Sequence, residues 1–254
     1  MSVVGMHRSA GRLEAALRAG HFVMTAETSP PDAGTAAPVL ERAGCLKGLA
    51  DAVNVTDGAG ARPHMSALAA SAILAQHGIE PVLQFTVRDR NRMALQSDLL
   101  GAAALGVPNI LCLHGDDVKK GDQPETKPVY DVDSRELMRT ARRLRDEGTF
   151  PSGRVVDPRP GLFIIVGIGP LPSARSARWM NENLFGVHVP EPLIARLEGA
   201  PDQRAEGRRI CVELLQELAE IKGVAGAHLM APRQEQACAD AITESGLLGR
   251  RKAA

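Results

Sequence analysis

The chain has 254 residues, 44% of them hydrophobic, and its 30 basic side chains balance its 30 acidic ones. A length of this order is one large domain or two small ones, and an α/β barrel typically takes about 250 residues. The charge balance gives no electrostatic case for nucleic acid or an anionic membrane, and one Trp, one Tyr and five Phe are few for base stacking or a peptide groove.

The first predicted elements are a helix and a strand. Ser9 is expected to cap a helix that carries Leu13 and Leu17 on one face and ends at Gly20. Residues 22–31, FVMTAETSPP, then predict a strand that brings Glu27 to its C-terminal end, because the double proline prevents the ladder from continuing. Taken alone, such a carboxylate is more often a solvated loop residue.

Three more strand and helix pairs follow at regular spacing. The strands are predicted at 51–56, 81–87 and 109–113, and the helices at 38–47, 65–77 and 91–105. This alternation indicates a parallel sheet whose strands all end at the same edge, where parallel α/β folds place their sites. Residues 119–127 are polar and are predicted to be a lid or binding loop.

The remaining part of the chain is also predicted to contain helices and strands. Helices are predicted after Asp133, through Trp179, after Pro190, at 205–221 and at 234–244, and strands at 161–168 and 226–230. We find no linker and expect one domain, residues 1–254, that forms a single catalytic α/β barrel.

The four cysteines lie far apart in apolar patterns, so their spacing indicates neither a metal site nor a redox pair. We expect Cys45, Cys112, Cys211 and Cys238 to be reduced core residues of a cytoplasmic protein. No window approaches the length of a membrane span, and the N-terminal residues show no secretion signal, so neither secretion nor membrane insertion is expected.

Polar side chains gather just past the predicted strand ends. They are Glu27, Thr56, Asp57, Gln84, Thr86, Arg88, Asp89, His114, Asp116 and Asp117. Their convergence on one edge favours a small-molecule site. There is no GxGxxG after a strand and no P-loop, so a Rossmann dinucleotide site is not supported. The histidines His64, His77, His188 and His228 show no ligand spacing and are expected to be ordinary surface or core residues, with no metal bound.

Five motifs occur in order along the chain. They are AETSPP at 26–31, VNVTDG at 53–58, ALQSDLLGAAA at 94–104, LHGDD at 113–117 and GIGPL at 167–171. Together they resemble the methylenetetrahydrofolate reductase family. The resemblance implies a (βα)₈ TIM-type barrel that binds FAD non-covalently and uses NADH or NADPH to reduce 5,10-methylenetetrahydrofolate to 5-methyltetrahydrofolate, in one-carbon and methionine metabolism.

The resemblance also implies roles for single residues. Glu27 matches the acid that promotes opening of the folate's five-membered ring, and Asp116 matches a carboxylate near flavin and pterin. The implied flavin contacts are Thr56, Gln84, His114, Gly115 and Tyr130, and the implied substrate contacts are Glu27, Asp116, Ser176 and Met180. The family often has His and Arg where this chain has Gln84 and His114, and an aromatic residue where it has Met180.

The chain departs from the family between Ile164 and Ile165, where about two βα units of the barrel are missing. Three explanations are open: a segment omitted from the sequence, a natural or engineered deletion, or an open barrel completed by another subunit. We favour the first, because the junction falls inside a strand, whereas natural deletions are tolerated in loops.

If the segment is truly absent, two other functions are open. One is a flavin-independent reductase that passes hydride directly from NADH or NADPH to the folate, and the other is a non-catalytic folate-binding or partner subunit. A pterin-binding methyltransferase barrel is weaker, since no cobalamin or zinc-thiolate signature is present. A homo-oligomer is compatible with the sequence but not required by it.

Overall fold

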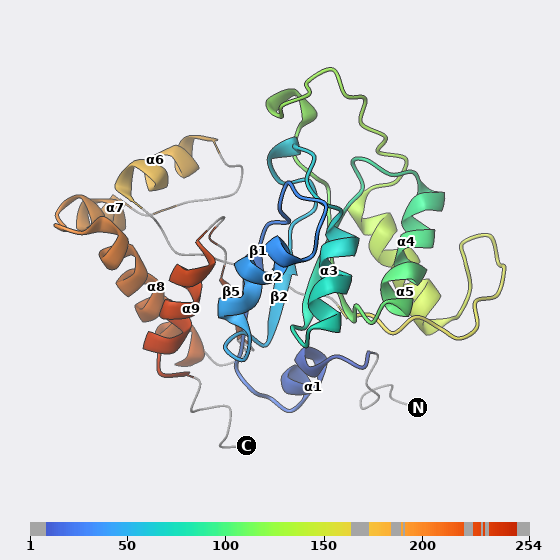
Figure 1. Ribbon diagram of the computed structural model, residues 1–254, viewed down its shortest axis with the longest axis horizontal. Coiled ribbons are helices and arrows are strands. Elements are labelled where there is room, and N and C mark those ends of the chain that lie inside the picture. The colour runs from blue at the N-terminus through green and yellow to red at the C-terminus, as the bar shows by residue number, and fades with distance from the viewer. Residues whose placement is uncertain are drawn as a thin grey trace.

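A computed structural model describes residues 9–163, 173–183, 189, 191–220, 226–229, 231 and 234–247. Its centre is a parallel five-stranded sheet in the order β4-β3-β2-β1-β5. The strands are β1 (Val23–Thr28), β2 (Ala52–Val55), β3 (Pro81–Thr86), β4 (Asn109–Leu113) and β5 (Gly226–Leu229). Figure 1 shows α2 and α3 across the front of the sheet, α4 and α5 on one side of it, and α6 to α9 on the other.

The helices are α1 (Arg12–Arg18), α2 (Ala37–Ala43), α3 (Ala67–Gln76), α4 (Arg92–Ala104), α5 (Ser134–Asp146), α6 (Ala174–Asn183), α7 (Glu191–Glu198), α8 (Gln203–Glu220) and α9 (Glu235–Glu244). Asp133 caps α5 as predicted, since its Oδ1 accepts a hydrogen bond from Glu136 N. No helix in the described part of the chain is long and apolar enough to cross a membrane.

The prediction that Ser9 caps the first helix is wrong. The cap position belongs to Gly11, and the side chain that accepts from the first turn comes from outside the helix. Glu80, at the start of β3, accepts hydrogen bonds from the backbone N–H groups of Arg12 (2.6 Å) and Leu13 (2.9 Å). Because a carboxylate satisfies the exposed N–H groups of a helix start better than a hydroxyl, α1 begins where Glu80 holds it.

The order of the strands in the sheet follows the chain. β1 pairs with β2 on one side and with β5 on the other, and each pairing is parallel. A further parallel bridge joins Asn109 of β4 to Phe163, so the chain reaches the outer side of β4 at that point. An α/β sheet in which the first strand contacts the last is the arrangement of a barrel, and the described strands form part of one.

The fold class is therefore confirmed in its coarser form, a parallel α/β sheet that makes up part of a TIM-type barrel. The described residues supply five strands and the bridge at Phe163, against the eight strands of a complete barrel. The junction between Ile164 and Ile165, and with it the rest of the strand predicted at 161–168, lies outside the described residues. The two missing βα units remain a hypothesis.

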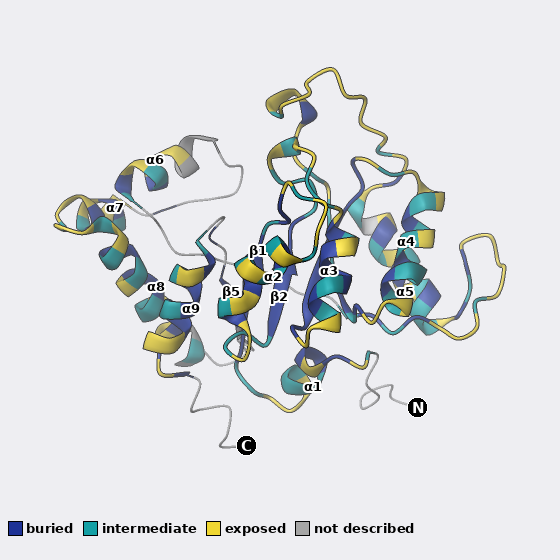
Figure 2. Cartoon of the chain, in the orientation of Figure 1, coloured by how far each residue is buried: buried dark blue, intermediate teal, exposed yellow. Residues whose placement is uncertain are grey.

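The two faces of the sheet differ because successive side chains of a strand point to opposite sides. The helix face, defined by Met24, Ala26, Val53, Val55, Leu83, Phe85 and Ile110, packs against the surrounding helices in the main core. The cavity face is defined by Val23, Thr25, Glu27, Ala52, Asn54, Val82, Gln84, Leu111 and His228. Leu13 of α1 packs on Val23, Ala52 and Val82 and closes this face at the N-terminal ends of the strands. Figure 2 shows the strands buried beneath their helices.

The cysteines are free thiols, and Cys211 and Cys238 are buried, whereas Cys45 and Cys112 are only partly so. Burial raises the pKa of Cys112 and of Cys238 to about 12 and that of Cys211 to about 11. Thiolate is the reactive form, so these three thiols are unreactive near neutral pH. Cys211 and Cys238 are thus core residues as predicted, whereas Cys45 and Cys112 lie partly exposed.

Candidate active site

A cavity of about 400 Å³ lies at the C-terminal end of the cavity face. It is lined by Glu27, Thr56, Asp57, Ala59, Gln84, Thr86, Leu111, Leu113, His114, Gly115, Asp116 and His228. The strand residues in this set come from one side of the sheet, because they alternate along β1, β3 and β4. The structure thus brings together seven of the ten polar residues predicted at the strand ends, and it adds His228.

Glu27 lies at the centre of the site and is only 4% exposed. Gln84 Nε2 donates a hydrogen bond of 2.6 Å to Glu27 Oε2. His228 Nε2 lies 3.8 Å from the same oxygen. Among the described residues no group donates to Oε1, so this oxygen is available to a ligand in the cavity.

Thr56 follows β2 and is buried, but its hydroxyl has no hydrogen-bond partner among the described residues. Buried hydroxyls are nearly always bonded, because an unbonded one has lost its water without replacement. The backbone N–H of Thr56 donates to Thr28 O, which fixes the residue at the cavity wall. Its Oγ1 is therefore a group that a bound molecule can satisfy.

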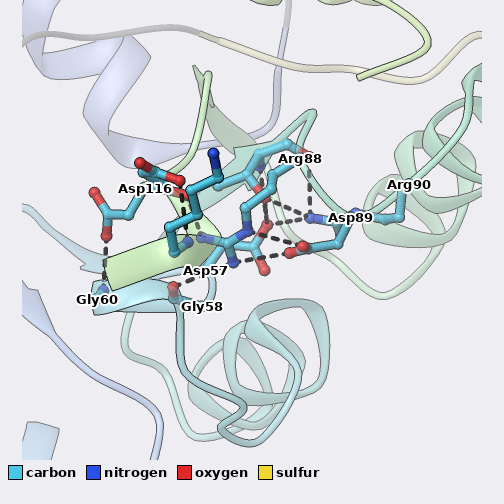
Figure 3. Close-up of polar contacts among 10 residues, drawn as sticks. Asp57, Gly58, Gly60, Arg88, Asp89, Arg90 and Asp116 are labelled. Carbon is cyan, nitrogen blue, oxygen red and sulfur yellow. Dashed lines mark hydrogen bonds and ion pairs between the residues drawn. The ribbon is translucent and has the colours of Figure 1, made fainter. Parts of the chain in front are cut away.

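Asp116 lies in the loop after β4 and is held against the loop after β2. Its Oδ2 accepts a hydrogen bond of 2.7 Å from Gly60 N. Arg88 joins the same two loops, donating to the carbonyl oxygens of Asp116 (3.3 Å) and Gly58 (3.2 Å), as Figure 3 shows. Hydrogen bonding to Asp89 raises the pKa of Arg88, so its guanidinium is a permanent charge that fixes the rim of the cavity.

Asp57 lines the cavity but is already occupied by protein groups. Its Oδ2 accepts hydrogen bonds from Thr86 N (2.9 Å) and Thr86 Oγ1 (3.0 Å) and forms an ion pair with Arg90. The guanidinium of Arg90 lies over the Phe85 ring, 4.3 Å from its centroid. Asp57 therefore ties the ends of β2 and β3 together. Of the carboxylates that line the cavity, Glu27 and Asp116 have no Arg or Lys partner among the described residues.

His114 and Tyr130 form a stacked pair, with ring centroids 4.4 Å apart and planes inclined by 5°. His114 lines the cavity. Tyr130 does not line it but packs against the His114 ring. Burial raises the pKa of Tyr130. Gly115 follows with φ of +97°, and a Cβ there would lie 2.9 Å from Arg88 Cβ, so glycine is required at this turn.

Five predicted site residues whose side chains the structure describes do not line the cavity: Arg88, Asp89, Asp117, Tyr130 and Ser176. Ser176 lies in the first turn of α6, where its Oγ is 3.2 Å from Ser173 Oγ. Asp89 pairs with Arg88, and Asp117 caps a short turn by accepting from Lys119 N. Tyr130 stacks on His114. Met180 lies on α6, but its side chain falls outside the described residues.

His228 is a residue of the site that the sequence did not predict. It was expected to be an ordinary surface or core histidine, whereas the structure places it in the cavity wall beside Glu27. Its position is set by β5, which pairs with β1 so that Thr25 and His228 are register partners. Only this pairing across about 200 positions of chain reveals it, because the short strand Gly226–Leu229 gives a weak local signal.

The fold and the site define a class, an α/β barrel-type protein with a carboxylate-lined cavity at the C-terminal ends of its strands. The chain belongs to the methylenetetrahydrofolate reductase family, whose model matches residues 12–151, more than half of the sequence. The family resemblance of the sequence motifs is thereby confirmed.

Comparison with curated proteins gave no match. Among solved structures, the chain is similar to an uncharacterized protein from Clostridium thermocellum that binds two copies of 5-methyl-5,6,7,8-tetrahydrofolic acid. The two share 11% sequence identity with a TM-score of 0.48, over 91% of this chain and 98% of the other.

Proposed function

We propose that this protein reduces 5,10-methylenetetrahydrofolate to 5-methyltetrahydrofolate, with NADH or NADPH as the reductant and bound FAD as the carrier of hydride. The observation that carries the proposal is the buried Glu27 at the wall of a cavity, with one oxygen held by Gln84 and the other without a donor among the described residues. Membership of the family supports the choice of substrate.

The reaction needs an acid at the folate. When the five-membered ring opens, the bond between the methylene carbon and N10 breaks, N10 takes up a proton, and N5 becomes part of a cationic iminium. Glu27 suits the acid role because its buried carboxyl group lies in the wall of the cavity, within reach of a bound folate. Gln84 holds Oε2, so Oε1 is the oxygen that delivers the proton.

The cavity also suits the cation that forms. Once Glu27 has given up its proton, its carboxylate lies against the iminium, and Asp116 adds a second negative charge at the rim. Both groups are fixed by hydrogen bonds before the charge develops, from Gln84 and from Gly60 N. Preorganised charges of this kind stabilise a transition state without further rearrangement.

FAD would be held at Thr56, Gln84, His114, Gly115 and Tyr130. The unbonded hydroxyl of Thr56 fits this role, because a heterocycle with carbonyl and ring nitrogen atoms would satisfy it. The stack on Tyr130 fixes the ring of His114 in the wall. When bound, FAD accepts hydride from the nicotinamide and passes it to the folate. We further propose that Ser176 and Met180 on α6 contact the folate.

The test is an absorbance spectrum of the purified protein, followed by reduction of methylenetetrahydrofolate with NADH or NADPH, with and without added FAD. We expect flavin bands, and a fall in kcat of about 10²- to 10⁴-fold in Glu27→Gln, which keeps the shape of the side chain but removes its acid. Glu14→Gln is the matched control, because Glu14 is a buried glutamate on α1, at the opposite end of the sheet. Its kcat should be unchanged.

Other outcomes of this test would indicate a different function. Turnover that is independent of flavin would make the protein a reductase with direct hydride transfer from the nicotinamide. Folate binding without turnover would make it a binding module or partner subunit. Equal activity in Glu27→Gln and the wild type would remove Glu27 from the mechanism.

A further inference from the structure

His228 is held on β5 by a contact that selects one orientation of its ring. Its Nδ1 lies 2.8 Å from Thr25 Oγ1, on the neighbouring strand β1. Thr25 and His228 are register partners, and their exposed fractions are 2% and 3%, respectively. The ring is thus fixed by the sheet itself, and its other nitrogen, Nε2, points towards the cavity side of the pair.

Nε2 is buried and has no hydrogen-bond partner among the described residues. A buried polar atom without a partner costs stability, because it has lost its water without replacement. The nearest acceptor is Glu27 Oε2, 3.8 Å away, an oxygen already bonded by Gln84. In free enzymes, hydrogen bonds of catalytic groups are often long and shorten when the ligand binds.

The Thr25 contact is compatible with both tautomers of the neutral ring, because a hydroxyl can donate to Nδ1 or accept from it. When the hydroxyl donates, the ring carries its proton on Nε2, which can donate to a carboxylate of Glu27. When the hydroxyl accepts, Nε2 presents a lone pair, which can accept from a protonated Glu27. The ring can therefore form a hydrogen bond with Glu27 in either state of the acid.

We propose that His228 is a positioning residue for Glu27, and that Nε2–H stabilises the carboxylate left when Glu27 gives its proton to N10. This inference rests on the proposed function. In the step, the proton moves from Glu27 Oε1 to N10, and the electrons of the broken C–N10 bond remain on N10. Glu27 then carries a negative charge between the iminium and Nε2–H. Thr25 is the second positioning residue, since its hydroxyl fixes the orientation of the His228 ring.

The other titratable groups around this pair are few. Asp57, His114 and Asp116 line the same cavity, and Glu235 of α9 accepts a hydrogen bond from Thr28, next to Glu27. Burial raises the pKa of Cys238 of α9 to about 12, and the negative charge of Glu27 acts in the same direction, so this thiol stays neutral.

Two substitutions separate positioning from packing. His228→Asn keeps an amide near the Nδ1 position but removes the donor that faces Glu27, so kcat should fall roughly 10- to 100-fold, as for the loss of a hydrogen bond to a charged group, with little change in KM. His228→Gln carries an amide N–H to about the position of Nε2 and should restore most of kcat. Thr25→Val, which frees the orientation of the ring, should give an intermediate kcat. His77→Asn, at a histidine just after α3 that does not line the cavity, should match the wild type.

A second measurement does not depend on turnover. The Nε2–H proton of the His228 ring is followed by NMR in the wild type and in Glu27→Gln, and its resonance should move in the variant, because a neutral amide replaces the neighbouring carboxylate. An unchanged resonance, or equal losses of kcat in His228→Asn and His228→Gln, would overturn the inference. A wild type without turnover would instead overturn the proposed function, while the NMR measurement still decides whether Nε2 contacts Glu27.

Discussion

The two faces of the sheet are built from the same strands but differ in chemistry. On β2, Val53 and Val55 lie on the helix face, whereas Asn54 and the following Thr56 lie on the cavity face. All four are buried, so burial alone does not tell them apart. What differs is the partner: helices cover one face completely, and the other ends in a cavity.

Unbonded polar atoms show the same difference. Within the described residues, five buried side-chain polar atoms have no hydrogen-bond partner, and those of Thr56 and His228 both belong to the lining of the cavity. A face that serves only to pack would replace such groups with apolar ones. A parallel sheet can therefore carry a core and a site at once, because the alternation of side chains assigns neighbouring residues to opposite faces.

The largest expected effect on stability is on the helix face. Phe85→Ala removes a fully buried ring that packs in the main core and lies under the Arg90 guanidinium. Because it leaves a cavity, the free energy of unfolding should fall by about 3–5 kcal/mol, measured by urea denaturation. Phe85→Leu, the control, should lose clearly less. A loss below about 1 kcal/mol would show that the helix face is not closely packed.

An intermediate effect is expected when the chemistry of one face is moved to the other. Val55→Thr introduces a hydroxyl of nearly the same size on the helix face, where apolar side chains surround it. The free energy of unfolding should fall by about 1–3 kcal/mol, because the hydroxyl is buried without a partner. Thermal denaturation checks this, and unchanged stability would mean that the hydroxyl finds a bond in the core.

The mirror substitution sharpens the comparison and has the smallest effect. Thr56→Val removes the unbonded hydroxyl from the cavity face, so stability should be equal to or above that of the wild type. Ligand affinity should fall by about 2- to 10-fold, as for the loss of one hydrogen bond, measured as the Kd for FAD by titration. A variant that is less stable but binds FAD as well as the wild type would show that Thr56 is purely structural.

Local sequence signals predicted most elements of the first half of the chain. Asn91 caps α4 through Met93 N and Ala94 N, and Asp133 caps α5, as the positions of polar residues before apolar runs indicate. The helix predicted at 38–47 is shorter than expected, because α2 ends at Ala43 and continues as a short 3₁₀ turn, Gly44–Leu46. The start of α1 is held by Glu80, a residue far along the chain, and not by Ser9 as predicted.

Local sequence patterns were enough to predict the alternating α/β class, the strand ends and the position of Glu27, because these depend on apolar runs, prolines and caps that act over a few residues. Which polar residues meet depends instead on contacts between distant parts of the chain. The pairing of β1 with β5 placed His228 beside Glu27, and the side of each strand that faces away from the helices selected Gln84 and Thr56 for the cavity. Contacts of this kind join residues far apart in the chain, and local patterns carry no record of them.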